Sequence, residues 1–364
     1  MRIACVSSHR DTLNSVRPEA ELFIGLARAG VETTVYTQAD SVYAERMRAG
    51  GVTVVDFEPR GKINWGSIRA LRRHLRAGEY DIVYSFNNKA ITTANLASSG
   101  LPMKVVTYRG QTGNIHRYDP AAYLTHLHPR VNAIIAVAEA VADSLRPHVR
   151  RCQQVFTVYK GHDLAWYTDA PVARASLGIE ANDVLLTCVA NNRPRKGVPV
   201  LLDAMAQLSD QPCLKLALIG AGMDVATLGA ELTQRGLTGR VSLLGFRDDA
   251  PAVLAASDMS VLPAIKREGL PKSVIESMAY AVPPIVTDTG GSAELVADGE
   301  SGLVVPPNDA DALARALRRL ATEPDTRSHF GQAARQRIAS HFSVQRAVAD
   351  TQAAFEAIVT AASG

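Results

Sequence analysis

Short apolar runs alternate with helical patterns along almost the whole chain. Seven strand-like runs come first, RIACVSS, ETTVYT, VTVVDF, DIVYSF, KVVTYRG, AIIAVAE and QVFTVYKG, and six follow, VLLTCVA, LKLALIG, VSLLG, MSVLPA, PPIVT and GLVVP. Strands that alternate with helices predict parallel sheets with crossover helices. We therefore expect two doubly wound α/β domains.

A polar and aromatic stretch, HDLAWYTDAPVARASLGIEAND, separates the two series of strands. We expect a first domain over residues 1–165, a second over residues 166–345, and a last helix over residues 346–364 that returns toward the first domain. The last part of the chain shows only helical patterns, broken at Pro324 and near Phe342. A length of 364 residues suits two domains that each bury their own core.

Composition and the N-terminal sequence indicate a cytoplasmic protein. The chain is 47% hydrophobic and 21% charged, which is typical of a soluble globular protein. Its start, MRIACVSSHRD, is too short for the apolar core of a signal peptide, and no run approaches the ~20 apolar residues that cross a bilayer. No CxxC spacing or metal cluster is visible, so we expect buried, reduced thiols at Cys5, Cys152, Cys188 and Cys213.

The net charge of +3 is unevenly spread. Residues 1–165 hold 21 Lys and Arg against 14 Asp and Glu, so the first half attracts an anionic partner. Within it, the helical stretch INWGSIRALRRHLRAGEY places Ile68, Leu71 and Leu75 on one face, with arginines around them. A crossover helix packed on its sheet explains this pattern, and peripheral contact with an anionic membrane is the alternative.

Ligands of open parallel sheets bind beyond the carboxyl ends of the strands, and two such sheets that face each other make an interdomain cleft. After VLLTCVA, the loop NNRPRKG carries Arg193, Arg195 and Lys196 at the start of a helix. Cations and free helix N–H groups suit a phosphate or diphosphate, although a solvated basic turn explains the loop equally well. The stretch LIGAGMDV has Val225 where a dinucleotide fingerprint needs its third glycine, so we interpret it as a tight turn.

Two glutamates eight positions apart follow the strand MSVLPA. The loop IKREG holds Glu268, and a helix predicted over residues 270–281, with Pro271 in its first turn, holds Glu276. Carboxylates only accept hydrogen bonds, so the pair suits a ligand rich in hydroxyls, such as a sugar nucleotide. A helix-cap acid and a surface acid would also explain an isolated pair.

Six motifs in the second half resemble the retaining GT-B glycosyltransferases of family 4: RKG at 195–197, IGAG at 219–222, LLGF at 243–246, EGLPKSVIESMA at 268–279, DTGG at 288–291 and ELVADGESGLVVPPND at 294–309. The resemblance implies two Rossmann-like domains and transfer of a sugar from a nucleoside-diphosphate sugar to a glycan or glycolipid hydroxyl. It implies bacterial envelope synthesis, for example of lipopolysaccharide, with a UDP-sugar preferred over a GDP-sugar. It implies neither a metal nor any further cofactor.

The resemblance also implies roles for individual residues. Glu276 would bind the ribose, Lys196 the diphosphate and Glu268 the transferred sugar. The expected catalytic residues are Glu268, Lys196 and Arg109. The other expected donor-binding residues are Arg193, Arg195, Phe246, Arg247, Gly269, Leu270, Pro271 and Lys272. The expected acceptor-binding residues are His9, Asn14, Asn87, Asn88, Lys89 and Arg117, although Asn87 and Asn88 could instead cap a helix.

The sequence departs from the family pattern at three places. SSHRDTLNSVRPEAEL replaces a Gly-Gly turn, Arg109 stands where histidine is common, and Asn191 stands where many members have arginine. Arg193 or Arg195 could replace that arginine, and the backbone carbonyl of Arg109 could still support positive charge at the anomeric carbon. A GT-B phosphorylase, an epimerase and a non-catalytic nucleotide-sugar-binding partner are the alternative functions.

Overall fold

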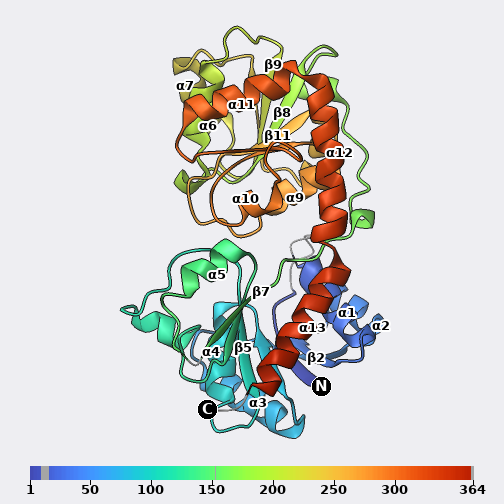
Figure 1. Ribbon diagram of the computed structural model, residues 1–364, viewed down its shortest axis with the longest axis vertical. Helices are drawn as coiled ribbons and strands as arrows, with labels where there is room; N and C mark the ends of the chain where they lie inside the picture. Colours follow the sequence, from blue (N-terminus) through green and yellow to red (C-terminus); the bar gives the residue numbers. More distant parts are fainter. Residues whose placement is uncertain (10–15, 152, 362–364) are drawn as a thin grey trace. The chain divides into compact units, whose positions relative to one another are not determined.

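A computed structural model describes residues 1–9, 16–151 and 153–361 (Figure 1). The chain divides into two compact units. The first unit consists of Met1–His162 together with Phe342–Gly364, and the second consists of Asp163–His341. The segment that ends the chain therefore belongs to the first unit.

The first unit is built on a parallel sheet of seven strands in the order β3-β2-β1-β4-β5-β6-β7. The strands are β1 (Arg2–Val6), β2 (Glu32–Thr37), β3 (Thr53–Asp56), β4 (Ile82–Ser85), β5 (Lys104–Arg109), β6 (Ala133–Ala136) and β7 (Gln154–Thr157). Each lies within one of the seven predicted runs, which confirms the predicted doubly wound domain. The chain reverses direction across the sheet between β1 and β4, which pair directly.

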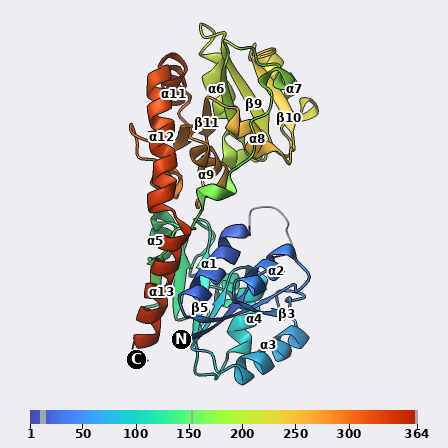
Figure 2. The ribbon, with the colours of Figure 1, turned by 90° about the vertical axis from the view of Figure 1, so that its right-hand side faces the viewer.

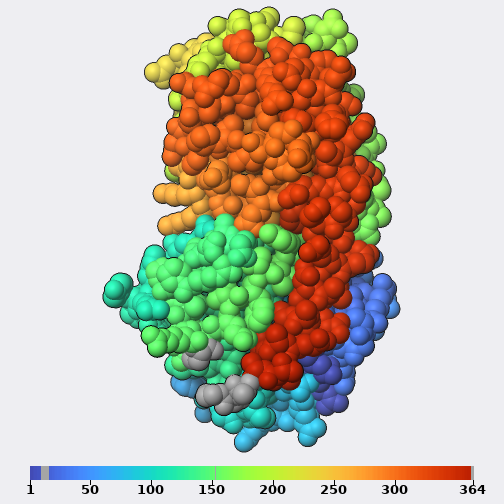
Figure 3. Space-filling model, viewed as in Figure 1, coloured from blue at the N-terminus to red at the C-terminus, as the bar shows by residue number. Residues whose placement is uncertain are grey.

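Helices cover both faces of this sheet. Parallel crossovers are right-handed, and the chain adds strands toward one edge of the sheet up to β3 and toward the other edge from β4 on, so the helices of the two halves pack on opposite faces. They are α1 (Arg17–Arg28), α2 (Val42–Ala49), α3 (Trp65–Ala77), α4 (Asn88–Ala97), α5 (Glu139–Leu145) and α13 (Val344–Thr360). The last helix, α13, packs against α1 and lies on the surface of the first unit (Figure 3). It places Phe355 and Ile358 in the same core as Phe23 and Tyr84.

Helix α3 is the amphipathic helix of the basic half. Its residues Ile68, Leu71 and Leu75 are buried, as expected for a crossover helix packed on its sheet. Arg72 donates hydrogen bonds to the carbonyl oxygens of Ala97 and Ser99, at 2.8 and 2.5 Å. The apolar face of α3 is therefore already used inside the unit.

The second unit holds a parallel sheet of six strands in the order β10-β9-β8-β11-β12-β13. The strands are β8 (Val184–Val189), β9 (Leu214–Ile219), β10 (Val241–Gly245), β11 (Met259–Leu262), β12 (Pro284–Thr287) and β13 (Leu303–Val305). The helices are α6 (Val198–Ala206), α7 (Val225–Gln234), α8 (Ala250–Ala255), α9 (Lys272–Ala279), α10 (Ser292–Leu295), α11 (Ala310–Thr322) and α12 (Pro324–His341). Figure 2 shows α11 and α12 next to each other, and α12 also packs on α9. All six predicted strands are confirmed.

The cysteines only partly match the prediction. Cys5 and Cys188 are buried free thiols, but Cys213 is exposed because it lies in the turn that precedes β9. Cys152 lies outside the described residues. Among the helices of the described ranges, none combines the length and the apolar character that crossing a membrane requires.

Candidate functional site

The candidate site lies where the order of strands in the sheet of the second unit reverses. From β8 the chain continues to β9 on one side, whereas from β11 it continues to β12 on the other, and β8 and β11 pair directly. Ligands of doubly wound sheets bind outside the carboxyl ends of the strands at such a point. The two loops that leave these strands are residues 190–197 and 263–271.

A glycine brings these two loops together. The loop after β8 forms a short 3-10 turn, η4 (Pro194–Lys196), and reaches α6 through Gly197, whose φ is +70°. A Cβ at Gly197 would lie 1.9 Å from the carbonyl oxygen of Pro263, so only glycine permits this approach. The backbone N–H of Ile265 also donates to the carbonyl of Arg195 at 2.8 Å.

Lys196 and Glu268 meet across these loops. Lys196 Nζ lies 2.8 Å from Glu268 Oε1, and Arg195 Nη1 lies 3.7 Å from the same oxygen. Glu268 is only 5% exposed. On its other side, a Cβ at Gly290 would lie 2.1 Å from the backbone carbonyl oxygen of Glu268, so the turn after β12 fixes this residue as well. A buried acid is thus held between a cationic loop and a glycine turn.

Glu276 is the second buried acid, and it lies just over one turn inside α9. It is 4% exposed, and its Oε1 lies 2.8 Å from Lys272 Nζ in an ion pair whose geometry is not that of a hydrogen bond. Burial raises the pKa of Glu276, and Lys272 opposes this shift. The side chain therefore retains capacity to accept hydrogen bonds from a ligand. Pro271 precedes α9 as its N-cap, so the prediction that placed it within the first turn is wrong by one position.

The start of α9 adds an uncharged set of donors to the two acids. The first N–H groups of any helix have no partner within the helix, and they favour an anion. Helix α9 begins at Lys272, four residues after Glu268, and Gly269 and Leu270 lie between them in the loop. The same segment therefore carries an acid for hydroxyl groups and N–H groups for phosphate.

Phe246 and Arg247 follow β10, two strands away from β8 in the sheet. The side chain of Phe246 is 67% exposed, as a residue available for stacking would be. Arg247 is held by Asp249 through two hydrogen bonds of 2.7 and 2.6 Å. Over the described residues, neither side chain has an ion pair or side-chain hydrogen bond with Lys196, Glu268 or Glu276.

Asn191 contributes to loop structure. Its Oδ1 accepts a hydrogen bond from the N–H of Ala221 at 3.1 Å, which ties the loop after β8 to the turn after β9. A Cβ at Gly220 would lie 2.1 Å from the carbonyl oxygen of Ala190, as expected for a tight packing turn. Of the two arginines that could replace the family arginine, Arg195 contacts Glu268, whereas Arg193 is exposed and has no ion pair within the described ranges.

In the first unit, Arg109 ends β5 and its guanidinium is bound locally. It donates to the carbonyl oxygen of Gln111 at 2.9 Å and to that of Gly113. Arg109 and Asn88 line the same cavity of about 170 Å³. The structure thus brings one expected catalytic residue together with one expected acceptor-binding residue.

His126 lines that cavity too, and sequence reasoning missed it. Its Nδ1 lies 2.9 Å from Thr107 Oγ1. Burial, and then the charge of Arg109, lowers the pKa of His126 to about 3, so the imidazole is neutral at physiological pH. The residue lies in an irregular connection between β5 and β6, where no periodic pattern marks a buried position.

The remaining first-domain candidates have different surroundings. Asn87 caps α4, because its Oδ1 accepts the N–H of Ala90 at 3.0 Å, and Lys89 is exposed. Arg117 holds the carbonyl oxygens of His148 and Val149 at 3.1 and 3.0 Å.

His9 follows β1 and is fully buried. Its backbone N–H donates to Thr37 Oγ1 and Gln38 Oε1, both at 3.1 Å, and burial lowers its pKa. Its Nε2 has no partner among the described residues. Asn14 lies outside the described residues.

Two family models match the chain, one in each half. The model described as Glycosyltransferase Family 4 matches residues 20–166, and the model described as Glycosyl transferases group 1 matches residues 169–337. Among curated proteins, the lipopolysaccharide core biosynthesis glycosyltransferase LpsE of Rhizobium meliloti is 31% identical over 172 residues, which are 47% of this chain and 49% of LpsE. The chain spans about half the length of the curated relatives it first matches.

Solved structures share the fold along the whole chain. A glycosyltransferase from Rickettsia africae has a TM-score of 0.79 at 16% identity, with 99% of both chains covered. Anabaena Alr3699/HepE in complex with UDP has a TM-score of 0.76 at 20% identity, with 98% of this chain and all of that chain covered. These similarities show the GT-B fold, two Rossmann-like domains with C-terminal helices.

Proposed function

The chain belongs to the GT-B glycosyltransferases of family 4, and from this premise we propose that it transfers a sugar from a nucleoside-diphosphate sugar to a hydroxyl group of an envelope glycan or glycolipid. Lipopolysaccharide is the first candidate product. The observation that carries the proposal is the 2.8 Å contact of Lys196, in the loop after β8, with Glu268, in the loop before α9. This contact supports the proposal, because Lys196 would bind phosphate and Glu268, next to it, would bind sugar hydroxyls.

Different residues of the second unit would bind different parts of the donor. Glu276 would accept hydrogen bonds from the ribose hydroxyls, and Glu268 would orient the transferred sugar. Lys196, Arg195 and the N–H groups at the start of α9 would hold the diphosphate, and stabilise the charge that develops as it leaves. These groups provide positive charge without a metal ion, so we propose that the enzyme needs none.

We propose that the reaction retains the anomeric configuration. The bond between the anomeric carbon and the diphosphate oxygen breaks, and the acceptor oxygen bonds to that carbon from the same face. The acceptor proton passes to the departing phosphate. Glu268 stays a hydrogen-bonding group and does not form a covalent bond to the sugar.

Uridine diphosphate is the preferred nucleotide of this proposal, with guanosine diphosphate as the second choice. The support is indirect: Alr3699/HepE, which shares the fold at 20% identity, was solved with UDP. Phe246, exposed at the end of β10, would stack on the base. Arg109, Asn88 and His126, which line one cavity of the first unit, would contact the acceptor.

Peripheral contact with the cytoplasmic face of a membrane is part of the proposal, and exposed apolar residues support it. Ile63 and Trp65, just before and at the start of α3, are 52% and 66% exposed. Lys62 and the partly exposed Leu124 line the cavity of Arg109, so an apolar and cationic surface borders a pocket for an acceptor. Indole rings and cations are favoured at anionic lipid surfaces.

Two measurements test this function. In a thermal-shift screen of nucleoside diphosphates and nucleotide sugars, the compounds that carry one particular base should raise the melting temperature of the protein. A ligand that binds only the folded chain stabilises it. With that donor and an envelope glycan, product NMR should show the anomeric configuration of the donor. An inverted linkage rejects the mechanism.

Other outcomes favour the alternative functions. Dependence on inorganic phosphate favours a phosphorylase, and interconversion of nucleotide sugar without acceptor favours an epimerase. Binding without any release of nucleoside diphosphate favours a non-catalytic partner.

A further inference from the structure

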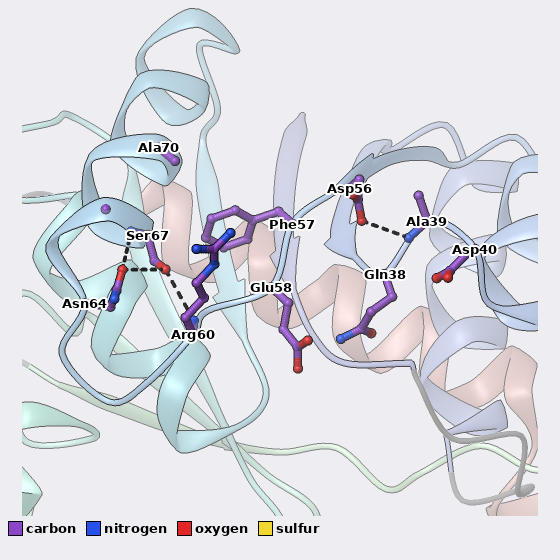
Figure 4. A pocket seen from close by; sticks show the side chains of 11 residues that line it. Gln38, Ala39, Asp40, Asp56, Phe57, Glu58, Arg60, Asn64, Ser67 and Ala70 are labelled. Atoms are coloured by element: carbon purple, nitrogen blue, oxygen red, sulfur yellow. Dashed lines mark hydrogen bonds between the residues drawn. The ribbon is translucent and has the colours of Figure 1, made fainter.

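The first unit contains an open pocket of about 820 Å³ whose described lining residues differ from the donor and acceptor residues assigned above (Figure 4). One of them, Gln38, accepts the backbone N–H of His9 at 3.1 Å. The pocket is formed by residues 38–40 after β2, by Asp56 at the end of β3 with Phe57, Glu58 and Arg60 after it, and by the beginning of α3. The carboxyl edge of a parallel sheet is where doubly wound domains bind ligands. The volume lies within the ~300–1,000 Å³ of ligand pockets.

The lining of this pocket is acidic, although the unit around it is basic. Among the residues that the structure describes, the lining holds three acids, Asp40, Asp56 and Glu58, and one cation, Arg60. By contrast, residues 1–165 as a whole hold 21 basic against 14 acidic residues. Figure 4 shows Asp40 and Asp56 on one side of the pocket, Arg60 on the other and Glu58 between them. An anionic ligand would be repelled here, although most of the unit would attract it.

Two of these acids, Asp40 and Asp56, can accept hydrogen bonds from a ligand. Asp56 uses one oxygen, Oδ1, for the backbone N–H of Ala39 at 3.2 Å, which leaves Oδ2 for a ligand. Asp40 is exposed and has no hydrogen bond or ion pair within the part of the chain that the structure describes. Ionised carboxylates only accept hydrogen bonds, so their natural partners are hydroxyl and ammonium groups.

The opposite wall is held by hydrogen bonds and a ring contact within the chain. Asn64 caps α3, with its Oδ1 accepting the N–H of Ser67 at 2.8 Å and the Ser67 hydroxyl at 3.1 Å. Ser67 Oγ in turn accepts the backbone N–H of Arg60 at 3.3 Å. Phe57 is buried, with its ring edge-on to Tyr36 at 6.1 Å. A preformed wall lowers the ordering cost of binding.

We propose that this pocket binds a sugar unit of the acceptor glycan that presents hydroxyl or protonated amino groups and carries no acidic group. Asp40 and Asp56 accept hydrogen bonds from the sugar, and their negative charge excludes uronic acids and phosphorylated sugars. Arg60 donates to a hydroxyl or ring oxygen. The role of this glycan as the acceptor rests on the glycosyltransferase function proposed above, whereas the charge preference rests on the pocket itself.

The test is binding of the full chain to a printed array of bacterial surface glycans, grouped as neutral, amino-bearing and acidic. Neutral or amino-bearing glycans should bind and acidic ones should not. Hydrogen exchange with the strongest binder should show protection in residues 38–40, 56–60 and 64–67. Binding confined to acidic glycans, binding to no neutral or amino-bearing glycan, or protection elsewhere would overturn the proposal.

Variants make the test specific to the pocket. Asp40→Asn combined with Asp56→Asn should weaken binding of the best glycan at least about tenfold, since each removes a charged hydrogen-bond acceptor. It should also admit acidic glycans. Glu45→Gln, an exposed acid on α2 that does not line the pocket, is the matched control and should bind as the wild type does. Unchanged binding by the double variant contradicts the inference.

A parallel measurement separates this inference from the proposed function. The shift in melting temperature that UDP or GDP causes tests the nucleotide site proposed for the second unit. A nucleotide-dependent shift without neutral or amino-bearing glycan binding refutes the pocket assignment and leaves the glycosyltransferase proposal standing. Glycan binding without any response to a nucleotide refutes the donor site and leaves the pocket assignment intact.

Discussion

Lys196 Nζ lies 2.8 Å from Glu268 Oε1, although the two residues are 72 positions apart in the sequence. In the free protein, the cation expected to hold the diphosphate and the acid expected to hold the sugar are therefore each other's partner. Breaking a buried pair by removing one member leaves an uncompensated charge. The two single substitutions should consequently have different effects.

Replacing Lys196 by methionine should weaken binding of the nucleoside diphosphate by about 10- to 100-fold, because a charge-assisted hydrogen bond is lost. It should also lower the melting temperature without ligand, because Arg195, 3.7 Å away, is then the one described cation that pairs with Glu268. Isothermal titration calorimetry and thermal melting measure the two effects. Full affinity in this variant would mean that Lys196 does not contact the diphosphate.

Unlike the replacement of Lys196, Glu268→Gln should not weaken binding of the nucleoside diphosphate. It removes the acid that competes for Lys196, so nucleoside diphosphate affinity should be equal to the wild-type value or tighter. Sugar transfer should fall about 100-fold or more, since the acid would orient the transferred sugar. Comparison of calorimetry with initial rates separates binding from transfer. Loss of nucleotide affinity in this variant would contradict the assigned roles.

Glu276 should make nucleotide binding depend on pH. Burial raises its pKa, so protonation begins at a higher pH than for an ordinary glutamate. Affinity for UDP should fall as the pH is lowered through this raised pKa, because the carboxylic acid is a poorer acceptor for ribose hydroxyls. Glu276→Gln should bind UDP about tenfold more weakly at pH 8 and lack this pH dependence. Because the diphosphate titrates in both proteins, their difference isolates the carboxyl group.

Glu276 should also reduce the stability of the free protein at neutral and alkaline pH. A carboxyl whose pKa is raised by folding binds more protons in the folded state, so stability falls as the pH rises through the raised value. The substitution Glu276→Gln should therefore raise the melting temperature at pH 8, and the gain should shrink toward acid pH. Lys272 loses its partner but is partly exposed, so this loss is small. A lower melting temperature at pH 8 would contradict this account.

Gly290 should be required for the position of Glu268. A Cβ there would lie 2.1 Å from the Glu268 carbonyl oxygen, and the φ of Gly290 is +53°. Gly290→Ala should reduce both stability and transfer, because the backbone of Glu268 must move. Gly299→Ala is the matched control: its φ is +74° but nothing lies within 4 Å, so it should cost only ~1–2 kcal/mol of stability and keep activity. Equal activities would show that the turn can relax.

The strands could be predicted because each is a short run of apolar and β-branched residues between turns. Parallel strands share one carboxyl edge, so the sequence predicts that the loops of Lys196 and Glu268 lie at the same edge of the sheet, as they do. Their direct contact could not be predicted, because it depends on how closely two loops approach. That approach is set by Gly197 and Gly290, whose role emerges only when neighbouring carbonyl oxygens are located.

The first unit was harder to interpret from sequence because its polar residues lie in irregular loops. Asn87 and Asn88 are adjacent, yet one caps α4 and the other lines a cavity. The burial of His126 could not be predicted from the sequence, because buried residues of an irregular loop follow no periodic pattern. The acidic pocket unites residues from three segments, after β2, after β3 and at the start of α3, and only tertiary packing assembles them.

The exposed pair Ile63 and Trp65 should determine whether the protein binds membranes. Ile63→Ser combined with Trp65→Ser should reduce flotation with phosphatidylglycerol-containing vesicles at least about tenfold, because burying each side chain in lipid contributes ~1.5–3 kcal/mol. Val225→Ser, a change at a residue of the second unit that is 72% exposed, is the matched control and should float as the wild type does. Raising the salt concentration should weaken wild-type binding, since the cations near Trp65 are at the surface. Wild-type protein that fails to float at low salt would eliminate the membrane contact and leave the sugar-transfer proposal unchanged, because the donor residues lie in the other unit.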